Sequence, residues 1–190
     1  LTNTGSAHIF VRNNTTWALE KTLRNETNRD ASTNPLTAQE YFGAGVSISD
    51  DGTRVIVGSP GLHEPIANGQ YWVGSAFIFN KSVTNDWIIS TRIAHPNPAG
   101  YTSSTPSVSS DYFGGSGNGH LACLAISGDG THVIAGVPYD DIDVGGVLKT
   151  DAGSIQVYRV SRPDEIAGFV FDSSTQVFTA TGAGIVSGST

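Results

Sequence analysis

The apolar residues of this chain form short runs that follow the two-residue period of β-strands. In residues 17–23, apolar positions such as Trp17 and Leu19 alternate with other residues, and residues 87–93 repeat this pattern. Such alternation is typical of a strand with one buried face. Residues 55–57 and 133–135 are apolar at every position, which predicts strands covered on both faces. Only the stretch 37–40 weakly indicates a helix, so the sequence predicts an all-β fold.

Two blocks of sequence occur more than once, and they are the strongest signal in the chain. The block Gly5–Phe10 reads Gly-Ser-Ala-His-Ile-Phe; it returns at 74–79 and more loosely at 153–158. The block Ile48–Pro60 returns as Ile126–Pro138, and Tyr-Phe-Gly precedes both copies. The chain is therefore predicted to consist of repeated β units.

Each copy of the second block contains an Asp-Gly pair between apolar runs, at Asp51-Gly52 and at Asp129-Gly130. Because Gly readily adopts the positive φ of a tight turn, each pair predicts a β-hairpin. Trp17 and Trp87 follow the first block at nearly the same spacing. They are predicted to hold equivalent places in successive units.

The order Tyr-Phe-Gly, Ser-x-Asp-Gly, Gly-x-Pro, Gly-Ser-Ala-x-Ile-Phe and Trp resembles the FG-GAP repeat of integrin α-subunit β-propellers and of many secreted proteins. The resemblance covers residues 5–160 and implies propeller-type antiparallel blades. It places half a blade at 5–23, a blade at 41–93 and another at 111–160. Neither Asp-Gly hairpin has the Asp-x-Asp-x-Asp-Gly loop that binds calcium in that family, so the resemblance brings no calcium site.

About two and a half blades cannot close a propeller ring, which needs about 4 to 8. Either the chain is part of a longer repeat protein, or other copies complete its open strand edges. Residues 1–162 hold the repeats, and the tail 163–190 has strand-like runs. We expect the tail either to close its own domain or to pack on an identical subunit and so build filaments. The tail residues expected to make this assembly contact are Phe169, Phe171, Val177 and Phe178.

The charge balance argues against nucleic acid as a partner. The chain has 10 Lys and Arg against 17 Asp and Glu, a net charge of -7, and no basic cluster. It has no run of about 20 apolar residues, so membrane insertion is not expected. The single Cys123 lies in an apolar run and is predicted to be a buried, unpaired thiol. If the protein is secreted, four sequons would accept N-glycans, at Asn13, Asn14, Asn25 and Asn80.

Signatures of nucleophilic, metalloprotease and phosphate-binding sites are absent from the sequence, and the five His residues show no ligand spacing. The sequence therefore predicts a protein that is not an enzyme and requires no cofactor. One acidic loop after the second hairpin could hold a hard cation such as calcium. Its candidate ligands are Asp141, Asp143 and Asp151, and a solvated acidic loop is the alternative.

Four long connections, at 24–40, 61–73, 94–110 and 139–152, are rich in Asn, Pro, Ser, Thr and Gly. Long loops on a rigid scaffold often carry binding residues. The loop aromatics could stack on a glycan or a cell-surface protein, or they could pack the loops against the blades. These aromatics are Tyr71, Trp72 and Tyr101.

Two functions are compatible with these patterns. The first is a structural role outside the cell or on a cell or virion surface, as the repeating subunit of a fibre, appendage, virion or surface layer. The alternative is an integrin-like adhesin that contacts glycan or protein through its loops. The structural role is favoured because the predicted blades are too few to close a ring.

Overall fold

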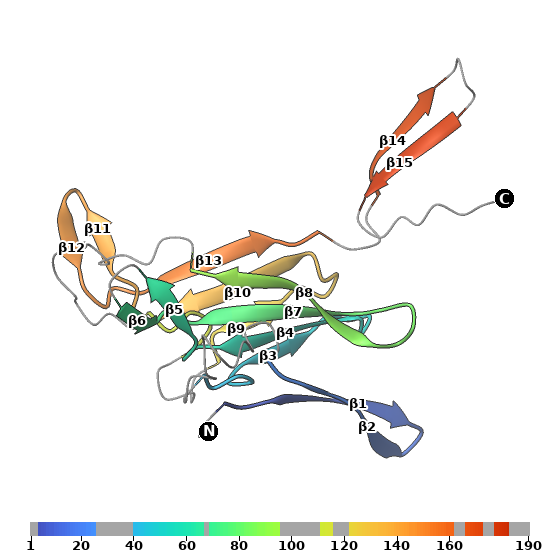
Figure 1. Ribbon diagram of the computed structural model, residues 1–190, viewed down its shortest axis with the longest axis horizontal. Helices are drawn as coiled ribbons and strands as arrows, with labels where there is room; N and C mark the ends of the chain where they lie inside the picture. The colour runs from blue at the N-terminus through green and yellow to red at the C-terminus, as the bar shows by residue number, and fades with distance from the viewer. Residues whose placement is uncertain are drawn as a thin grey trace.

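The computed structural model describes residues 4–25, 40–66, 69–95, 111–115, 122–161, 166–172 and 177–182 (Figure 1). Every regular element in these ranges is a β-strand, and all the named strands pair in antiparallel fashion. The prediction of an all-β chain is therefore confirmed. In the same ranges, no helix is long and apolar enough to cross a membrane.

The strands run in the following order along the chain. They are β1 (Ala7–Asn13), β2 (Thr16–Leu23), β3 (Val46–Ile48), β4 (Arg54–Ser59), β5 (His63–Ile66), β6 (Gly69–Trp72), β7 (Ser75–Lys81), β8 (Trp87–Ala94), β9 (Leu124–Ile126), β10 (His132–Val137), β11 (Ile142–Val144), β12 (Val147–Lys149), β13 (Ser154–Arg159), β14 (Ile166–Asp172) and β15 (Val177–Gly182).

The largest sheet has the strand order β3-β4-β7-β8. A smaller hairpin, β5-β6, is inserted between β4 and β7. The second sheet has the order β13-β10-β9, with the hairpin β11-β12 inserted at the matching place. The second sheet therefore repeats the first without its fourth strand.

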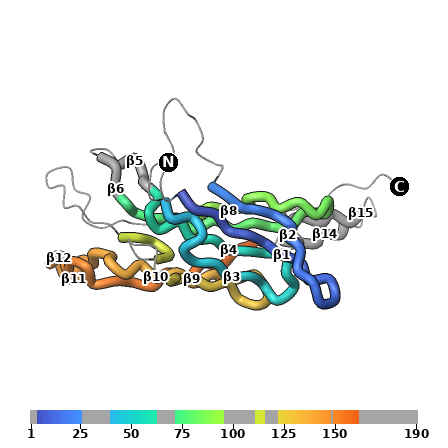
Figure 2. Tube along the Cα trace, turned by 90° about the horizontal axis from the view of Figure 1, so that it is seen from below, coloured from blue at the N-terminus to red at the C-terminus, as the bar shows by residue number. Residues whose placement is uncertain are grey.

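Two apolar clusters hold these sheets together in layers. One cluster joins the β1-β2 hairpin to the first sheet and includes Leu23, Phe42 and Phe77. The other joins the first sheet to the second and includes Ile78 and Phe113. Figure 2 shows the resulting sequence of layers, from β1-β2 through β3-β4 to β9-β10. The central strands β4 and β7 of the first sheet are thus covered on both faces, as an apolar strand such as β4 requires.

The repeated sequence blocks occupy repeated positions in the fold. Gly5 bridges to Phe42, and Gly74 bridges to Phe113, in the same parallel arrangement. Both glycines have a positive φ, and a Cβ on Gly74 would lie 2.6 Å from the Phe113 backbone nitrogen. Only glycine fits this close approach without strain. The Gly of the recurring Gly-Ser-Ala sequence therefore marks the place where the Tyr-Phe-Gly segment of the following repeat contacts the chain.

The Asp-Gly pairs form the predicted hairpin turns. Gly52 and Gly130 have φ values of 67° and 72°. Asp51 lies in the turn between β3 and β4, and Asp129 lies in the turn between β9 and β10. The prediction of a hairpin in each copy is confirmed.

Two predictions about burial are wrong in the second unit. Strand β4 is buried at every position, but β10 alternates between buried and exposed residues because no sheet of the described chain covers its outer face. Cys123 was expected to be buried, but it is only partly buried and its thiol is free. Cys123 lies next to Gly136 of β10, where a Cβ on Gly136 would be 3.0 Å from the Cys123 Cβ.

The tail contains the two strands β14 and β15, which pair with each other as a hairpin. Phe171 lies opposite Phe178, and Asp172 lies opposite Val177. The strand-like runs of the tail are therefore strands. The contact between this tail and an identical subunit stays a prediction.

Candidate functional site

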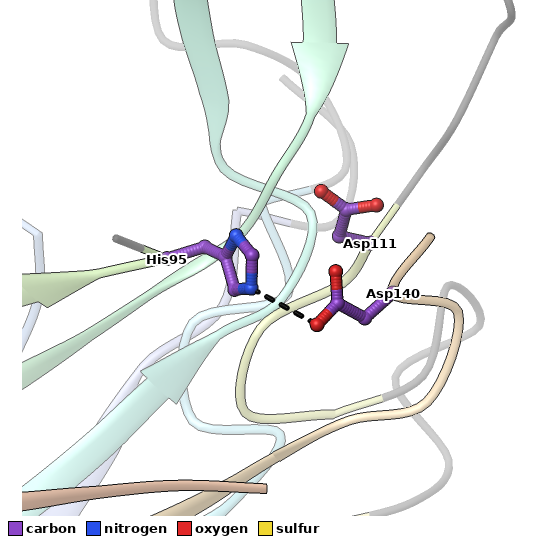
Figure 3. Close-up of side chains that lie close together, drawn as sticks. All are labelled: His95, Asp111 and Asp140. Atoms are coloured by element: carbon purple, nitrogen blue, oxygen red, sulfur yellow. Dashed lines mark hydrogen bonds and ion pairs between the residues drawn. The ribbon is translucent and has the colours of Figure 1, made fainter. Parts of the chain in front are cut away.

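A histidine and two aspartates from three separate segments meet at the junction of the two sheets. Figure 3 shows the imidazole of His95 facing the carboxyl groups of Asp140 and Asp111. One ligand atom from each of these side chains lies within 4.8 Å of the other two. The arrangement could hold a metal ion, because imidazole nitrogen and carboxylate oxygen are both common metal ligands.

Strand ends and backbone hydrogen bonds next to each member place this group. His95 directly follows Ala94, the last residue of β8. Asp111 directly precedes Tyr112, whose amide donates to the Trp72 carbonyl at 3.2 Å. Asp140 lies in the turn after β10, and its carbonyl accepts the Gly153 amide at 3.0 Å. His95 thus comes from the end of the first sheet, Asp111 from the connection between β8 and β9, and Asp140 from the turn after β10 of the second sheet.

The group is closed to solvent. His95, Asp111 and Asp140 are 8%, 0% and 5% exposed. His95 Nε2 and Asp140 Oδ2 are hydrogen-bonded at 3.2 Å, and His95 Nδ1 is buried with no hydrogen-bond partner among the described residues. A buried polar atom without a partner is uncommon and costs stability. Because all three side chains are buried, the group is better placed to hold an ion than to bind a reacting substrate from solvent.

Sequence reasoning missed this group. The sequence placed the candidate cation ligands at Asp141, Asp143 and Asp151, and it showed no ligand spacing among the five His residues, His95 included. In the structure, Asp141 Oδ1 accepts the Asp151 amide at 2.8 Å, and Asp143 Oδ1 accepts the Gly146 amide at 2.7 Å. These three side chains do not belong to the His95 group, and cation binding by them stays a prediction.

The sequons differ in accessibility. The side chain of Asn25 is buried and donates to Glu40 Oε2 at 3.2 Å. Asn80 is also buried, and its Oδ1 accepts from Arg54 Nε at 2.9 Å. A folded chain offers neither amide to a glycan. Asn13 and Asn14 have exposed side chains at the β1-β2 turn.

Among the loop aromatics, Trp72 stacks on Tyr112 with 6.4 Å between ring centroids. Tyr112 in turn meets Tyr139 edge to face at 5.7 Å. This row connects the β5-β6 hairpin, the connection before Phe113 and the turn after β10. The backbone of Tyr71 pairs within β6, while its side chain and the whole of Tyr101 lie outside the described residues.

Comparisons with protein-family models, with curated proteins and with solved structures found no match to this chain. The class of the molecule therefore rests on its own residues. In its described residues, it is an all-β chain of repeated antiparallel sheets with a buried His-Asp-Asp group.

Proposed function

We propose that this chain is a non-enzymatic structural protein of an extracellular or surface assembly. Its sheets are propeller-type blades of the FG-GAP kind that do not close a ring within one copy. Copies stack through their open sheets and build a filament or layer. The observation that carries this proposal is a difference in burial between equivalent residues of the two sheets.

The outer face of the second sheet exposes apolar residues whose counterparts are buried in the first sheet. Ile134 and Val157 are paired across β10 and β13, and they are 44% and 65% exposed. Their counterparts Ile56 and Ile78 are paired across β4 and β7, and both are 0% exposed because the second sheet covers them. A contiguous exposed apolar face commonly marks an interaction site.

The first sheet is also partly open, on the face that turns away from the second sheet and lies beside the β1-β2 hairpin. Val46 and Ile48 of β3 are 57% and 53% exposed, beside a groove lined by β1 and β3 residues. Their counterparts Leu124 and Ile126 of β9 pack against the first sheet. The exposed β3 residues of one copy could therefore pack on the exposed outer face of the second sheet of another copy, as β9 packs on the first sheet within one chain. Such heterologous contacts between identical subunits propagate into open assemblies.

Among the described strands, β13 forms an edge of the second sheet that no further strand pairs with. Strand β13 begins 79 residues after β7 (Ser154 and Ser75), and β14 begins 79 residues after β8 (Ile166 and Trp87). By this spacing β14 is the expected fourth strand of the second sheet, but it pairs with β15. This supports a role for the tail in completing the edge of another copy.

The test is assembly of the purified chain. Ile155→Lys with Val157→Lys places two charges on the open face, and we expect it to keep the protein monomeric where the wild type forms concentration-dependent oligomers in sedimentation velocity. The control, Val144→Lys with Val147→Lys, changes two similarly exposed residues of the β11-β12 hairpin and should assemble like the wild type. A wild type that stays monomeric, or a face variant that assembles normally, would refute stacking.

A second candidate function is an adhesin-type binding module. One observation favours it: the partly exposed aromatic row of Trp72, Tyr112 and Tyr139, of which Tyr139 is 41% exposed. Aromatic faces at a loop cluster can stack on sugar rings. Glycan-array binding that Tyr139→Ala abolishes, by a protein that remains monomeric, would favour this function over the structural one.

A further inference from the structure

We propose that His95, Asp111 and Asp140 bind a structural divalent transition-metal ion of the zinc class, which ties the two sheets together at their junction. The proposal does not depend on assembly or on the adhesin alternative. It rests on the geometry of the group, on the comparison with the equivalent junction in the same chain, and on the chemistry of the three side chains.

The separation of the three side chains is close to what a metal requires. Ligands about 2.0 to 2.2 Å from a tetrahedral zinc ion lie about 3.3 to 3.6 Å from one another. His95 Nε2 and Asp140 Oδ2 are 3.2 Å apart, and the ligand atoms of the whole group lie within 4.8 Å. A small inward movement of Asp111 or Asp140 therefore completes a three-ligand site, with a fourth position for a water molecule.

The chain contains a second junction of the same construction, between β1-β2 and the first sheet. Asn25 lies two residues after Leu23 at the end of β2, as His95 lies two residues after Ile93 in β8. Glu40 directly precedes Tyr41, as Asp111 precedes Tyr112. Asn25 and Glu40 are buried and hydrogen-bonded to each other at 3.2 Å. They are the counterparts of His95 and Asp111.

Leu62 is the counterpart of Asp140. The Leu62 carbonyl accepts the Gly74 amide at 3.1 Å, and the Asp140 carbonyl accepts the Gly153 amide at 3.0 Å. Leu62 is 3% exposed and belongs to the apolar cluster of its junction. The fold therefore accommodates an apolar residue at this place. The junction between the first and second sheets instead has a buried carboxylate, Asp140, beside an imidazole and another carboxylate.

The chemistry of the group favours a cation. Buried carboxylate oxygens and an imidazole nitrogen lie together in this group, and divalent transition metals bind both kinds of ligand. A divalent cation at the group would be held by the two carboxylates and by His95 Nε2, the imidazole nitrogen that faces Asp140.

Zinc fits this donor set better than calcium. Calcium prefers six to eight oxygen ligands, whereas zinc is commonly held by four ligands that include His nitrogen and Asp oxygen. The group offers one nitrogen and two carboxylates in a closed site. The residues come from both sheets and from the connection between them, so the ion would cross-link parts of the chain distant in sequence. Such a site contributes directly to stability.

The experiment measures Zn²⁺ binding to the intact chain by competition with a chromophoric chelator, and thermal unfolding with and without Zn²⁺. We expect one ion per chain and a higher unfolding midpoint with the metal. Asp140→Leu copies the residue at Leu62, and His95→Asn copies Asn25. Each variant should weaken Zn²⁺ binding at least by the roughly 100-fold that loss of a supporting partner can cause. The exposed His132→Asn is the matched control and should bind like the wild type.

An absence of stoichiometric binding by the wild type would overturn the proposal, as would unchanged binding by Asp140→Leu. Stabilisation by Ca²⁺ but not by Zn²⁺ would also overturn it, because it would indicate a different donor set. X-ray absorption at the zinc edge of the wild-type protein gives an answer even if a variant fails to fold. One coordinating imidazole with oxygen ligands is expected, and none or several would contradict the site.

Discussion

At the scale of single residues, the two Asp-Gly turns show how one short motif determines local structure. Asp129 Oδ1 accepts from Ser127 Oγ at 2.5 Å and from the Thr131 amide at 3.0 Å. Asp51 makes the same two bonds, with Ser49 Oγ at 2.6 Å and with the Thr53 amide at 3.0 Å. The Asp side chain thus holds the turn from both sides, which explains the recurring Ser-x-Asp-Gly-Thr sequence.

The turn of Asp129 predicts a pH-dependent contribution to stability. The hydrogen bonds from Ser127 and Thr131 lower the pKa of Asp129 from 3.8 to about 2. Because this pKa is lower in the folded state, the contribution is present above about pH 4 and is lost as the pH falls towards 2. Replacing Asp129 by Asn should lower the unfolding midpoint at pH 6. The difference from the wild type should shrink between pH 4 and pH 2, and a constant difference across this range would contradict the prediction.

Trp17 and Trp87 test whether equivalent residues have equivalent roles. Trp17 lies opposite Arg12 in the β1-β2 hairpin, and Trp87 lies opposite Lys81 in the β7-β8 pair. The prediction of equivalent places is therefore confirmed. Their burial differs, however: Trp17 is 65% exposed and Trp87 is 5% exposed. The β1-β2 hairpin covers Trp87 and accepts its indole N–H at Glu20.

Replacing Trp87 by Ala should therefore lower the free energy of unfolding by about 3 to 5 kcal/mol, because a large buried side chain leaves a cavity. Replacing Trp17 by Ala should change it by no more than about 0.5 kcal/mol, as for most exposed positions. Chemical denaturation of both variants measures the difference. Equal losses would mean that a partner covers Trp17 in solution.

At the scale of elements, strands with similar sequences differ in exposure because they have different neighbours. β4 and β10 derive from the same repeated block, but β4 lies between two layers, whereas the described residues cover β10 on one face only. The apolar pattern of a strand indicates on how many of its faces the strand can be buried. Whether another layer is present depends on the rest of the molecule.

The tail hairpin β14-β15 gives a prediction at this scale. Ending the chain at Pro163 removes both strands, and none of the described residues of the two apolar clusters lies beyond that point. The truncated chain should keep its β circular dichroism spectrum and lose assembly in sedimentation velocity. Unfolding of the truncated chain, or unchanged assembly, would assign the tail to its own domain instead.

At the scale of the whole molecule, Arg54 is a buried link between the two sheets. It is 3% exposed, and its guanidinium donates to the carbonyls of Gly130 and Ser161 in the second unit. His132 occupies the equivalent position in that unit and is exposed. The difference again follows from the presence of a neighbouring layer on one side only.

Replacing Arg54 by Ala should lower the free energy of unfolding by more than about 2 kcal/mol, because it leaves buried carbonyl groups without donors. Replacing His132 by Ala should have an effect within about 0.5 kcal/mol. Urea unfolding of the two variants provides the comparison. A small effect at Arg54 would show that the sheets are not joined through this side chain.

The sequence by itself determined the β-strands, the Asp-Gly turns and the repetition, because these follow from local alternation and from glycine conformations that neighbouring residues impose. Tertiary structure alone decided which equivalent residues are buried, as Trp87 and Trp17 illustrate, because burial depends on layers contributed by distant segments. It also decided the His95, Asp111 and Asp140 group, whose members are 16 and 29 residues apart in sequence. No local spacing relates these residues, since they meet only where two sheets and their connection converge.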